Sequence, residues 1–153
     1  MKMNYDVIVV GAGPVGLWLA CELKLAGVDV AVIERRRERT AQSRALTIHG
    51  RSLEVFALRG IADRFLSKGK PIPTGHYAAL DTRLNFSTFD TRFPYTLFIP
   101  QAVTEARLEE RALELGVTVL RGITVTGIRD DGSRVHISTD GGEFSGSYVV
   151  GAD

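Results

Sequence analysis

The fold is decided by the stretch Tyr5–Gly16, YDVIVVGAGPVG. Its first half, Tyr5–Val10, is short, unbroken and rich in β-branched residues, which is typical of a strand buried on both faces of a parallel sheet. The glycine-rich half leads into an apolar stretch at 14–26 that predicts a helix, and Gly27 is placed to end it. A second buried strand is expected over Val28–Ile33. The sequence therefore predicts a βαβ unit, which implies a right-handed crossover.

Three glycines in this stretch, Gly11, Gly13 and Gly16, have the spacing Gly-x-Gly-x-x-Gly. The first permits a tight turn, the second lets a pyrophosphate approach the backbone, and the third lets the helix pack closely on the strand. The helix start offers free N–H groups and a positive dipole end, and Pro14 suits it because its missing N–H costs nothing there. Glu34 follows the second strand, where a carboxylate can accept both ribose hydroxyls. The motif predicts a dinucleotide site; the alternative is a glycine turn that binds nothing, with Glu34 a solvated strand end.

The residue at position 34 also bears on which dinucleotide is bound. A carboxylate there would repel a 2′-phosphate, which disfavours NADP at this site. The run Arg35-Arg36-Arg37 complicates this, since nearby arginines could serve such a phosphate or could simply be a solvated loop. Arg35 is next to the ribose position and could lie over the adenine edge.

The rest of the chain is expected to leave the simple βαβ alternation. The segment 71–100 contains four of the five prolines together with alternating apolar residues, which favours antiparallel strands and loops inserted between helices. The other predicted elements are a loop at 35–49, a helix at 51–58, an amphipathic helix at 104–115, and strands at 117–128, 134–139 and 144–150 joined by Asp-Gly turns.

Composition excludes several classes of protein. With 44% apolar and 24% charged residues, the chain is an ordinary globular one rather than disordered or fibrous. A net charge of +1 gives no general electrostatic case for nucleic acid or for an anionic membrane. A single cysteine cannot form an internal disulfide, and no apolar run is long enough to span a bilayer. We therefore expect a soluble, cytoplasmic protein with no nucleic-acid or membrane partner.

Other reactive side chains give weaker signals. Cys21 lies among apolar helix residues and is expected to be a small buried hydrophobe rather than a redox thiol. The histidines His49, His76 and His136 have no metal-ligand spacing, so no metal site is predicted. No catalytic triad or carboxylate pair is evident, and Arg51 is expected to form a salt bridge. Five aromatic residues could line a substrate cavity or fill the core, and core is favoured for most of them: Phe86, Phe89, Phe93, Tyr95 and Phe98.

Several stretches together resemble one family. The segment 5–36, YDVIVVGAGPVGLWLACELKLAGVDVAVIERR, is similar to the start of the class A FAD-dependent aromatic monooxygenases, which include the para-hydroxybenzoate hydroxylase-like enzymes. SRALTIHGRSLE at 43–54 and IPQ at 99–101 strengthen the resemblance, which is closest to aromatic polyketide hydroxylases and rifampicin and tetracycline monooxygenases. Gly151-Ala152-Asp153 resembles the opening of the family's second fingerprint. The resemblance therefore suggests an N-terminal fragment of such an enzyme.

The resemblance implies an architecture. The fold would be α/β: a Rossmann-like FAD-binding domain with a parallel sheet, a small antiparallel β meander and part of a β-rich substrate domain. Residues 1–70 would form the FAD-binding βαβ unit and second helix, and 71–100 the inserted strands and loops of the substrate domain. Residues 101–153 would return to the FAD-binding domain with a helix and the meander.

It also implies a role for each site residue. Gly11, Gly13 and Gly16, with Pro14 and Val15 in the same turn, would hold the FAD pyrophosphate, and Glu34 and Arg35 would lie at the adenosine ribose. Arg44 would contact FAD near the ribose and pyrophosphate, and Gln101 would bond the ribityl or pyrophosphate region. The backbone around Val125 would meet the adenine edge, and Asp153 would serve both FAD and NAD(P)H. No residue of this chain is implied to be catalytic.

The activity implied for the whole enzyme is hydroxylation of an aromatic, polyketide or antibiotic-type substrate. NAD(P)H would reduce FAD, and O2 would then give a flavin C4a-hydroperoxide that transfers oxygen to the ring. The alternatives are another FAD-dependent oxidoreductase of the same superfamily, or a nucleotide-binding module without activity of its own. A homo-oligomer is possible, and these 153 residues alone are not expected to turn over substrate.

Overall fold

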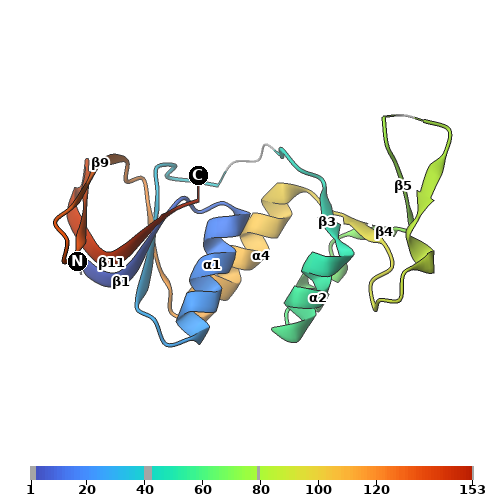
Figure 1. The fold of residues 1–153 in the computed structure, drawn as a ribbon, viewed down its shortest axis with the longest axis horizontal. Helices are drawn as coiled ribbons and strands as arrows, with labels where there is room; N and C mark the ends of the chain where they lie inside the picture. Colours follow the sequence, from blue (N-terminus) through green and yellow to red (C-terminus); the bar gives the residue numbers. More distant parts are fainter. Residues whose placement is uncertain (1–2, 40–42, 79, 153) are drawn as a thin grey trace. The chain divides into compact units, whose positions relative to one another are not determined.

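The computed structural model describes residues 3–39, 43–78 and 80–152. The chain divides into two compact units, shown with their elements in Figure 1. Unit 1 comprises Met1–Thr40 and Leu108–Asp153, and unit 2 comprises Ala41–Arg107. Helix α4 (Gln101–Glu114) runs from unit 2 into unit 1.

Unit 1 is built on a six-stranded sheet in the order β8-β2-β1-β11-β10-β9. Strands β8, β2, β1 and β11 are parallel, and β10 and β9 continue the sheet as an antiparallel meander. The predicted βαβ unit is present as β1, α1 and β2. The bounds are β1 Asn4–Val10, α1 Pro14–Leu25, β2 Val30–Glu34, β8 Thr118–Arg121, β9 Val125–Asp130, β10 Val135–Thr139 and β11 Gly142–Gly151.

The two faces of this sheet bury different partners. One face carries a cluster with Tyr5, Ile8 and Ile33 at its centre, closed by Ile137 and Phe144 of the meander. On α1 and the C-terminal part of α4, four further side chains are at most 1% exposed, namely Leu17, Cys21, Leu108 and Ala112. The Cys21 thiol lies 3.9 Å from the carbonyl oxygen of Leu108, and burial raises its pKa to about 11. Cys21 is thus the buried hydrophobe that the sequence predicted.

Unit 2 consists of short antiparallel strands and helices. Its sheets have the orders β3-β7-β4 and β5-β6, which agrees with the expectation for the proline-containing segment. Phe56 and Phe65 stack with ring centroids 4.5 Å apart and join α2 to α3. The bounds are β3 Thr47–His49, α2 Gly50–Leu58, α3 Ala62–Leu66, β4 Lys70–Ile72, β5 Thr74–His76, β6 Arg83–Asn85, a 3₁₀ turn Phe86–Thr88, and β7 Thr96–Phe98.

Three sequence predictions about elements were wrong. The strand expected over 117–128 is two strands, β8 and β9, at opposite edges of the sheet, because the chain turns at Gly122 with φ +74°. The predicted loop at 35–49 ends in β3, and α3 was not foreseen. Helix α4 begins at Gln101 rather than 104, because the carbonyl of Pro100 accepts the N–H groups of Val103 and Thr104.

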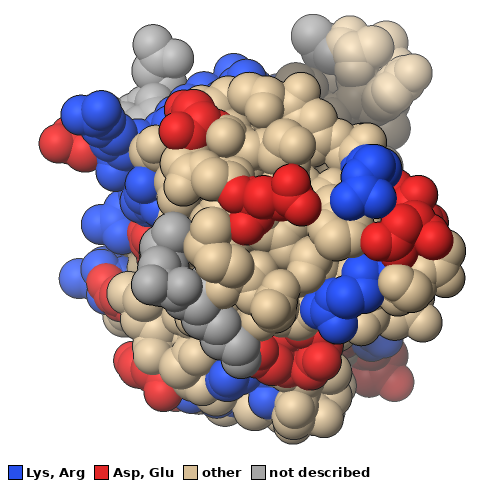
Figure 2. Space-filling model, turned by 90° about the vertical axis from the view of Figure 1, so that its left-hand side faces the viewer, with Lys and Arg blue, Asp and Glu red and all other residues tan. Residues whose placement is uncertain are grey.

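The surface carries no single-sign field on the face of Figure 2, where acidic and basic side chains both occur. This matches the net charge of +1. Among the described residues, no helix is long and apolar enough to cross a membrane.

The first residue of α2, Gly50, packs closely against the backbone of Phe93, and a substitution can test this contact. A Cβ added at Gly50 would lie 2.4 Å from the carbonyl oxygen of Phe93. Gly50→Ala should therefore lower the free energy of unfolding by about 1–3 kcal/mol through overpacking. Ser52→Ala, an exposed change on the same helix, should stay within about 0.5 kcal/mol of wild type in urea unfolding. Equal stabilities for the two variants would contradict the contact.

Candidate functional site

The glycine turn joins β1 to α1 at the carboxyl end of the parallel strands. Gly11 has φ +115°, and its N–H donates to the carbonyl of Ile33 at 2.8 Å. A Cβ added at Gly16 would lie 2.1 Å from the carbonyl oxygen of Gly11, so the helix touches the turn that leads into it. The close approach predicted from the glycine spacing is therefore present.

The start of α1 is left available to a ligand. Gly13 is the N-cap with extended backbone, Pro14 is the first helical residue, and no side chain caps the helix. The first N–H groups of a helix have no partner within it, so those of Val15 and Gly16 are potential donors to an anion. Val15 is 72% exposed, and among the described residues a Cβ at Gly13 would come within 4 Å of the carbonyl oxygen of Ala152 alone, at 4.0 Å. Open space thus adjoins the backbone where a phosphate would bind.

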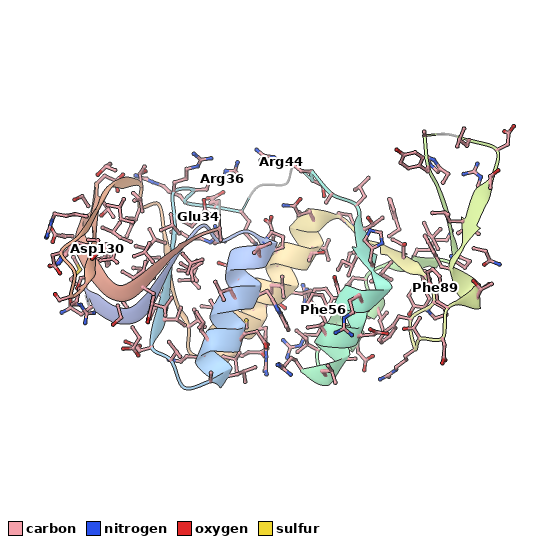
Figure 3. The ribbon with its side chains drawn as sticks, in the orientation of Figure 1. Glu34, Arg36, Arg44, Phe56, Phe89 and Asp130 are labelled. Atoms are coloured by element: carbon pink, nitrogen blue, oxygen red, sulfur yellow. The ribbon has the colours of Figure 1, made fainter. Side chains whose placement is uncertain are left out.

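Glu34 lies at this turn, at the end of β2 (Figure 3). Its Oε2 accepts the N–H of Ala12 at 2.9 Å, and its Oε1 accepts the N–H of Arg36 at 2.9 Å. Each carboxylate oxygen has a further acceptor site, so the group can still receive two ribose hydroxyls. Arg35 is exposed directly after it. The structure thus brings Glu34 and the glycine turn together.

The connection between β8 and β9 joins this group. The N–H of Ile123 donates to the carbonyl of Glu34 at 3.1 Å, and the N–H of Gly122 donates to the carbonyl of Arg36 at 3.3 Å. Val125 begins β9 two residues later, in register with Thr139. The predicted adenine-edge segment is therefore tied to the predicted ribose carboxylate.

Two further predicted residues, Arg44 and Gln101, come together in unit 2. The backbone N–H of Gln101 lies 2.6 Å from Oγ of Ser43 and 3.0 Å from the carbonyl of Ala45, the residues on either side of Arg44. The side-chain amide of Gln101 donates to Glu105 at 2.7 Å. Arg44 is exposed. Asp153, the last predicted residue, lies outside the described residues.

One buried ion-pair cluster was missed by sequence reasoning. The carboxylate of Glu109 is 8% exposed and lies between two arginines, 2.7 Å from Nη1 of Arg39 and 2.8 Å from Nε of Arg121. Burial raises the pKa of Glu109, but the hydrogen bonds from Arg121 and Arg39 outweigh it and lower that pKa below its ordinary 4.5. Apart from an acidic residue in a helix stripe that is otherwise apolar, no signal in the sequence could have found this cluster.

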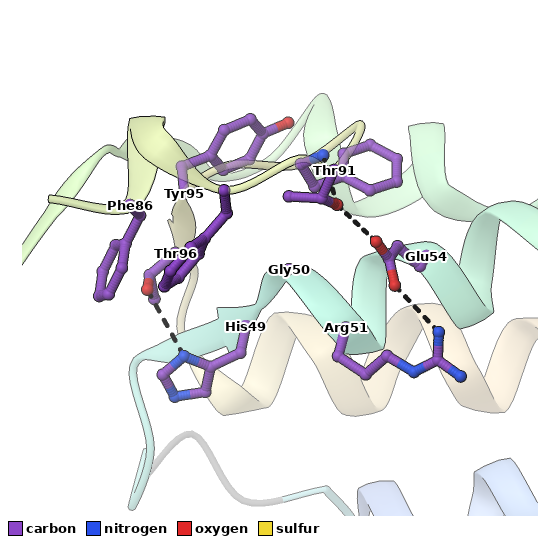
Figure 4. A pocket seen from close by; sticks show the side chains of 10 residues that line it. His49, Gly50, Arg51, Glu54, Phe86, Thr91, Tyr95 and Thr96 are labelled. Atoms are coloured by element: carbon purple, nitrogen blue, oxygen red, sulfur yellow. Dashed lines mark hydrogen bonds and ion pairs between the residues drawn. The ribbon is translucent and has the colours of Figure 1, made fainter.

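A cavity in unit 2 corrects the prediction that most of the aromatics fill the core. Phe93 is 3% exposed, but Phe89 is 61% and Phe98 is 41% exposed. Four of the five rings line a cavity of about 340 Å³ (Figure 4), together with polar side chains of α2 and of the segment before β7. Glu54 accepts hydrogen bonds from Thr91 and Arg51, and both lower its pKa. The salt bridge expected of Arg51 is therefore present.

Metal binding finds no support in the part of the chain that the structure describes. There, no group of three or more His, Cys, Asp or Glu side chains could hold an ion. The chemistry of the site is instead that of backbone N–H groups, one carboxylate and nearby arginines, which suits a nucleotide carrying a pyrophosphate and a free ribose.

Comparison with known proteins identifies the family of this chain. The family described as FAD binding domain matches residues 4–153. The chain belongs to this FAD-binding domain family. The resemblance and the α/β fold class predicted from sequence are thereby confirmed.

Three similar proteins show what kinds of protein carry the domain. An uncharacterized aromatic compound monooxygenase of Bacillus subtilis is 46% identical over all of this chain and 32% of its own length. The structure of an anhydrotetracycline hydroxylase from Streptomyces rimosus matches with a TM-score of 0.95 and 44% identity, over 99% of this chain and 32% of the other. A dialkyldecalin synthase of Streptomyces rugosporus is 40% identical over 99% of this chain and 32% of its own length. The chain thus spans about a third of the length of these proteins.

Substitutions of Gly13 and Gly16 should distinguish an effect on cofactor binding from an effect on stability. Gly13→Ala should leave the melting temperature unchanged, because in the described part of the chain its Cβ would meet the carbonyl oxygen of Ala152 no closer than 4.0 Å, yet it should weaken FAD binding about tenfold or more by obstructing the phosphate. Gly16→Ala should lower the melting temperature, because its Cβ would overlap the Gly11 carbonyl. Calorimetry and flavin fluorescence titration measure both effects. A destabilised Gly13→Ala, or one that binds FAD normally, would contradict this assignment.

The ion pairs of Glu109 give a pH dependence. Since the folded pKa lies below 4.5, ionised Glu109 stabilises the fold fully above pH 4.5, and this is lost as pH falls through the folded pKa. Urea midpoints of wild type should therefore drop between pH 6 and pH 3 more steeply than those of Glu109→Gln. Glu114→Gln, which changes a 47% exposed member of an i,i+3 pair, should keep the wild-type slope. Parallel curves for all three proteins would refute the role of Glu109.

Proposed function

We propose that this chain binds FAD for a monooxygenase that hydroxylates an aromatic substrate of polyketide or antibiotic type with NAD(P)H and O2. The observation that carries the proposal is the uncapped start of α1 beside Gly13 and the Glu34 carboxylate. Membership of the FAD-binding domain family and the similarity to an aromatic compound monooxygenase and an anhydrotetracycline hydroxylase support it.

In this proposal the residues of unit 1 bind the adenosine half of FAD. The N–H groups of Val15 and Gly16 donate to the pyrophosphate, and the positive end of the α1 dipole favours its charge. Glu34 accepts the ribose hydroxyls while its bonds to Ala12 and Arg36 keep the carboxylate oriented. Arg35 and the backbone near Val125 border the adenine.

Two further residues predicted from the sequence, Arg44 and Gln101, are proposed to contact the same cofactor. Arg44 supplies a positive charge toward the pyrophosphate, and Gln101 presents an amide that Glu105 orients. Asp153 would contact both FAD and the reductant. FAD supplies the redox chemistry that carries electrons from NAD(P)H to molecular oxygen, and the chain contributes binding, orientation and charge.

A second candidate function follows from the dialkyldecalin synthase, which carries a similar domain under a name that is not that of a monooxygenase. The FAD-binding residues alone do not choose between reactions, since function depends on groups at the substrate. An FAD-dependent protein of another activity is therefore the alternative. A cytoplasmic location, a homo-oligomer and the division at 71 and 100 stay predictions from sequence.

The test uses the full natural polypeptide that contains this sequence. Its visible spectrum should show bound flavin, and aromatic polyketides should stimulate NADH or NADPH oxidation with one atom of ¹⁸O2 entering the product. Glu34→Ala should weaken FAD binding about tenfold or more, because a charged acceptor is lost. A colourless protein that does not take up added FAD would overturn the proposal. Bound flavin with product free of ¹⁸O would instead favour the alternative.

A further inference from the structure

The cluster of Glu109 with Arg39 and Arg121 adjoins the predicted ribose site. Arg121 is the in-register neighbour of Glu34 on the adjacent parallel strand. Leu120 and Ile33, one position earlier on the same strands, both pack in the core cluster on one face of the sheet. Side chains alternate between faces, so Glu34 and Arg121 both point to the other face.

This placement makes Arg121 a competitor for the Glu34 carboxylate. Neighbouring strands are about 4.8 Å apart, and an arginine side chain spans that distance easily. A bidentate pair between the two would occupy the carboxylate oxygens that the ribose hydroxyls need. In the structure no such pair forms among the described residues: Nε of Arg121 is bound to Oε1 of Glu109 at 2.8 Å, and Glu34 accepts only backbone N–H groups in its recorded bonds.

Glu109 holds a second arginine in the same way. Nη1 of Arg39 lies 2.7 Å from Oε2 of Glu109, so one buried carboxylate binds Arg121, the neighbour of Glu34 in the sheet, and Arg39, which follows Glu34 in the connection after β2. The backbone at the start of this connection is also held, because the N–H groups of Ile123 and Gly122 donate to the carbonyls of Glu34 and Arg36. A buried carboxylate with two charged hydrogen bonds can hold both arginines in place. Without it, the two guanidinium groups would have no partner there and could pair with another carboxylate.

We propose that Glu109 is a positioning residue for the adenosine end of FAD, which retains Arg121 and Arg39 and so keeps the Glu34 carboxylate free for the ribose. The inference rests on the proposed FAD site. In this inference Arg121 pairs with Glu109 rather than with Glu34, and Glu109 itself does not contact the cofactor.

The experiment measures FAD affinity of the deflavinated full polypeptide by flavin fluorescence, with ADP as a competitor that carries the same ribose and pyrophosphate. Glu109→Gln should raise the Kd for FAD and the inhibition constant for ADP by the same factor, about tenfold, because Arg121 re-pairs with Glu34. Glu109→Asp, which keeps the charge but shortens its reach, should lie between Glu109→Gln and wild type. Glu114→Gln is the matched control on the same helix and should bind as wild type does.

The decisive comparison is rescue by a second substitution. Glu109→Gln/Arg121→Gln should recover most of the FAD affinity, because the competitor for Glu34 is gone, even though neither ion pair of Glu109 is restored. Failure of the double variant to recover affinity, with a lowered melting temperature, would show a purely structural role and overturn the inference. Wild-type affinity in Glu109→Gln would also overturn it. Wild-type protein that binds neither FAD nor ADP would instead defeat the proposed function itself.

Discussion

The contact between Gly16 of α1 and the carbonyl of Gly11 is the constraint on which the site depends. Any side chain at position 16 would overlap that oxygen, so only glycine lets the helix start directly above the end of β1. The position of the helix then sets the direction of its dipole and of the N–H groups at Val15 and Gly16. The parallel sheet brings the end of β2 to the same edge, which places Glu34 beside the turn. The close contact between Gly16 and Gly11 thus places the N–H donors of α1 beside the Glu34 carboxylate.

The site also has an electrostatic requirement. The arginines near Glu34 must stay close to it without forming an ion pair with its carboxylate. Five arginines follow β2 or end β8, at 35, 36, 37, 39 and 121. Two of them, Arg39 and Arg121, are bound to the buried carboxylate of Glu109. Guanidinium groups held by buried or backbone acceptors cannot rearrange freely, so the local charge pattern is determined by packing rather than by proximity alone.

The sequence predicted the parts of the fold that local patterns determine. The run before Gly11, the glycine spacing and Gly27 act over a few residues, and β1, α1 and β2 formed as expected. The strand over 117–128 was predicted wrongly because a short apolar run does not reveal which strand it pairs with. β8 pairs with β2, more than 80 residues away in the chain, whereas β9 pairs with β10, about ten residues away. Glu109 was missed for a related reason, since its partners are distant in sequence and meet only after the sheet has formed. The aromatics before β7 were assigned to the core by composition, which cannot tell a core from the wall of a cavity.

The same distinction explains why a binding domain is easier to identify than a reaction. The groups that would contact the cofactor are backbone N–H groups and one carboxylate, beside a backbone that Gly13 leaves without a side chain. They depend on a local geometry that proteins with different names can share. A hydroxylase acting on anhydrotetracycline and a dialkyldecalin synthase both carry domains at 40% identity or more to this chain. Selectivity for a substrate requires side chains shaped to that substrate, and backbone N–H groups and one carboxylate do not supply them. The FAD-binding domain is therefore what the chain has in common with these proteins, and the identity of the reaction must come from other groups.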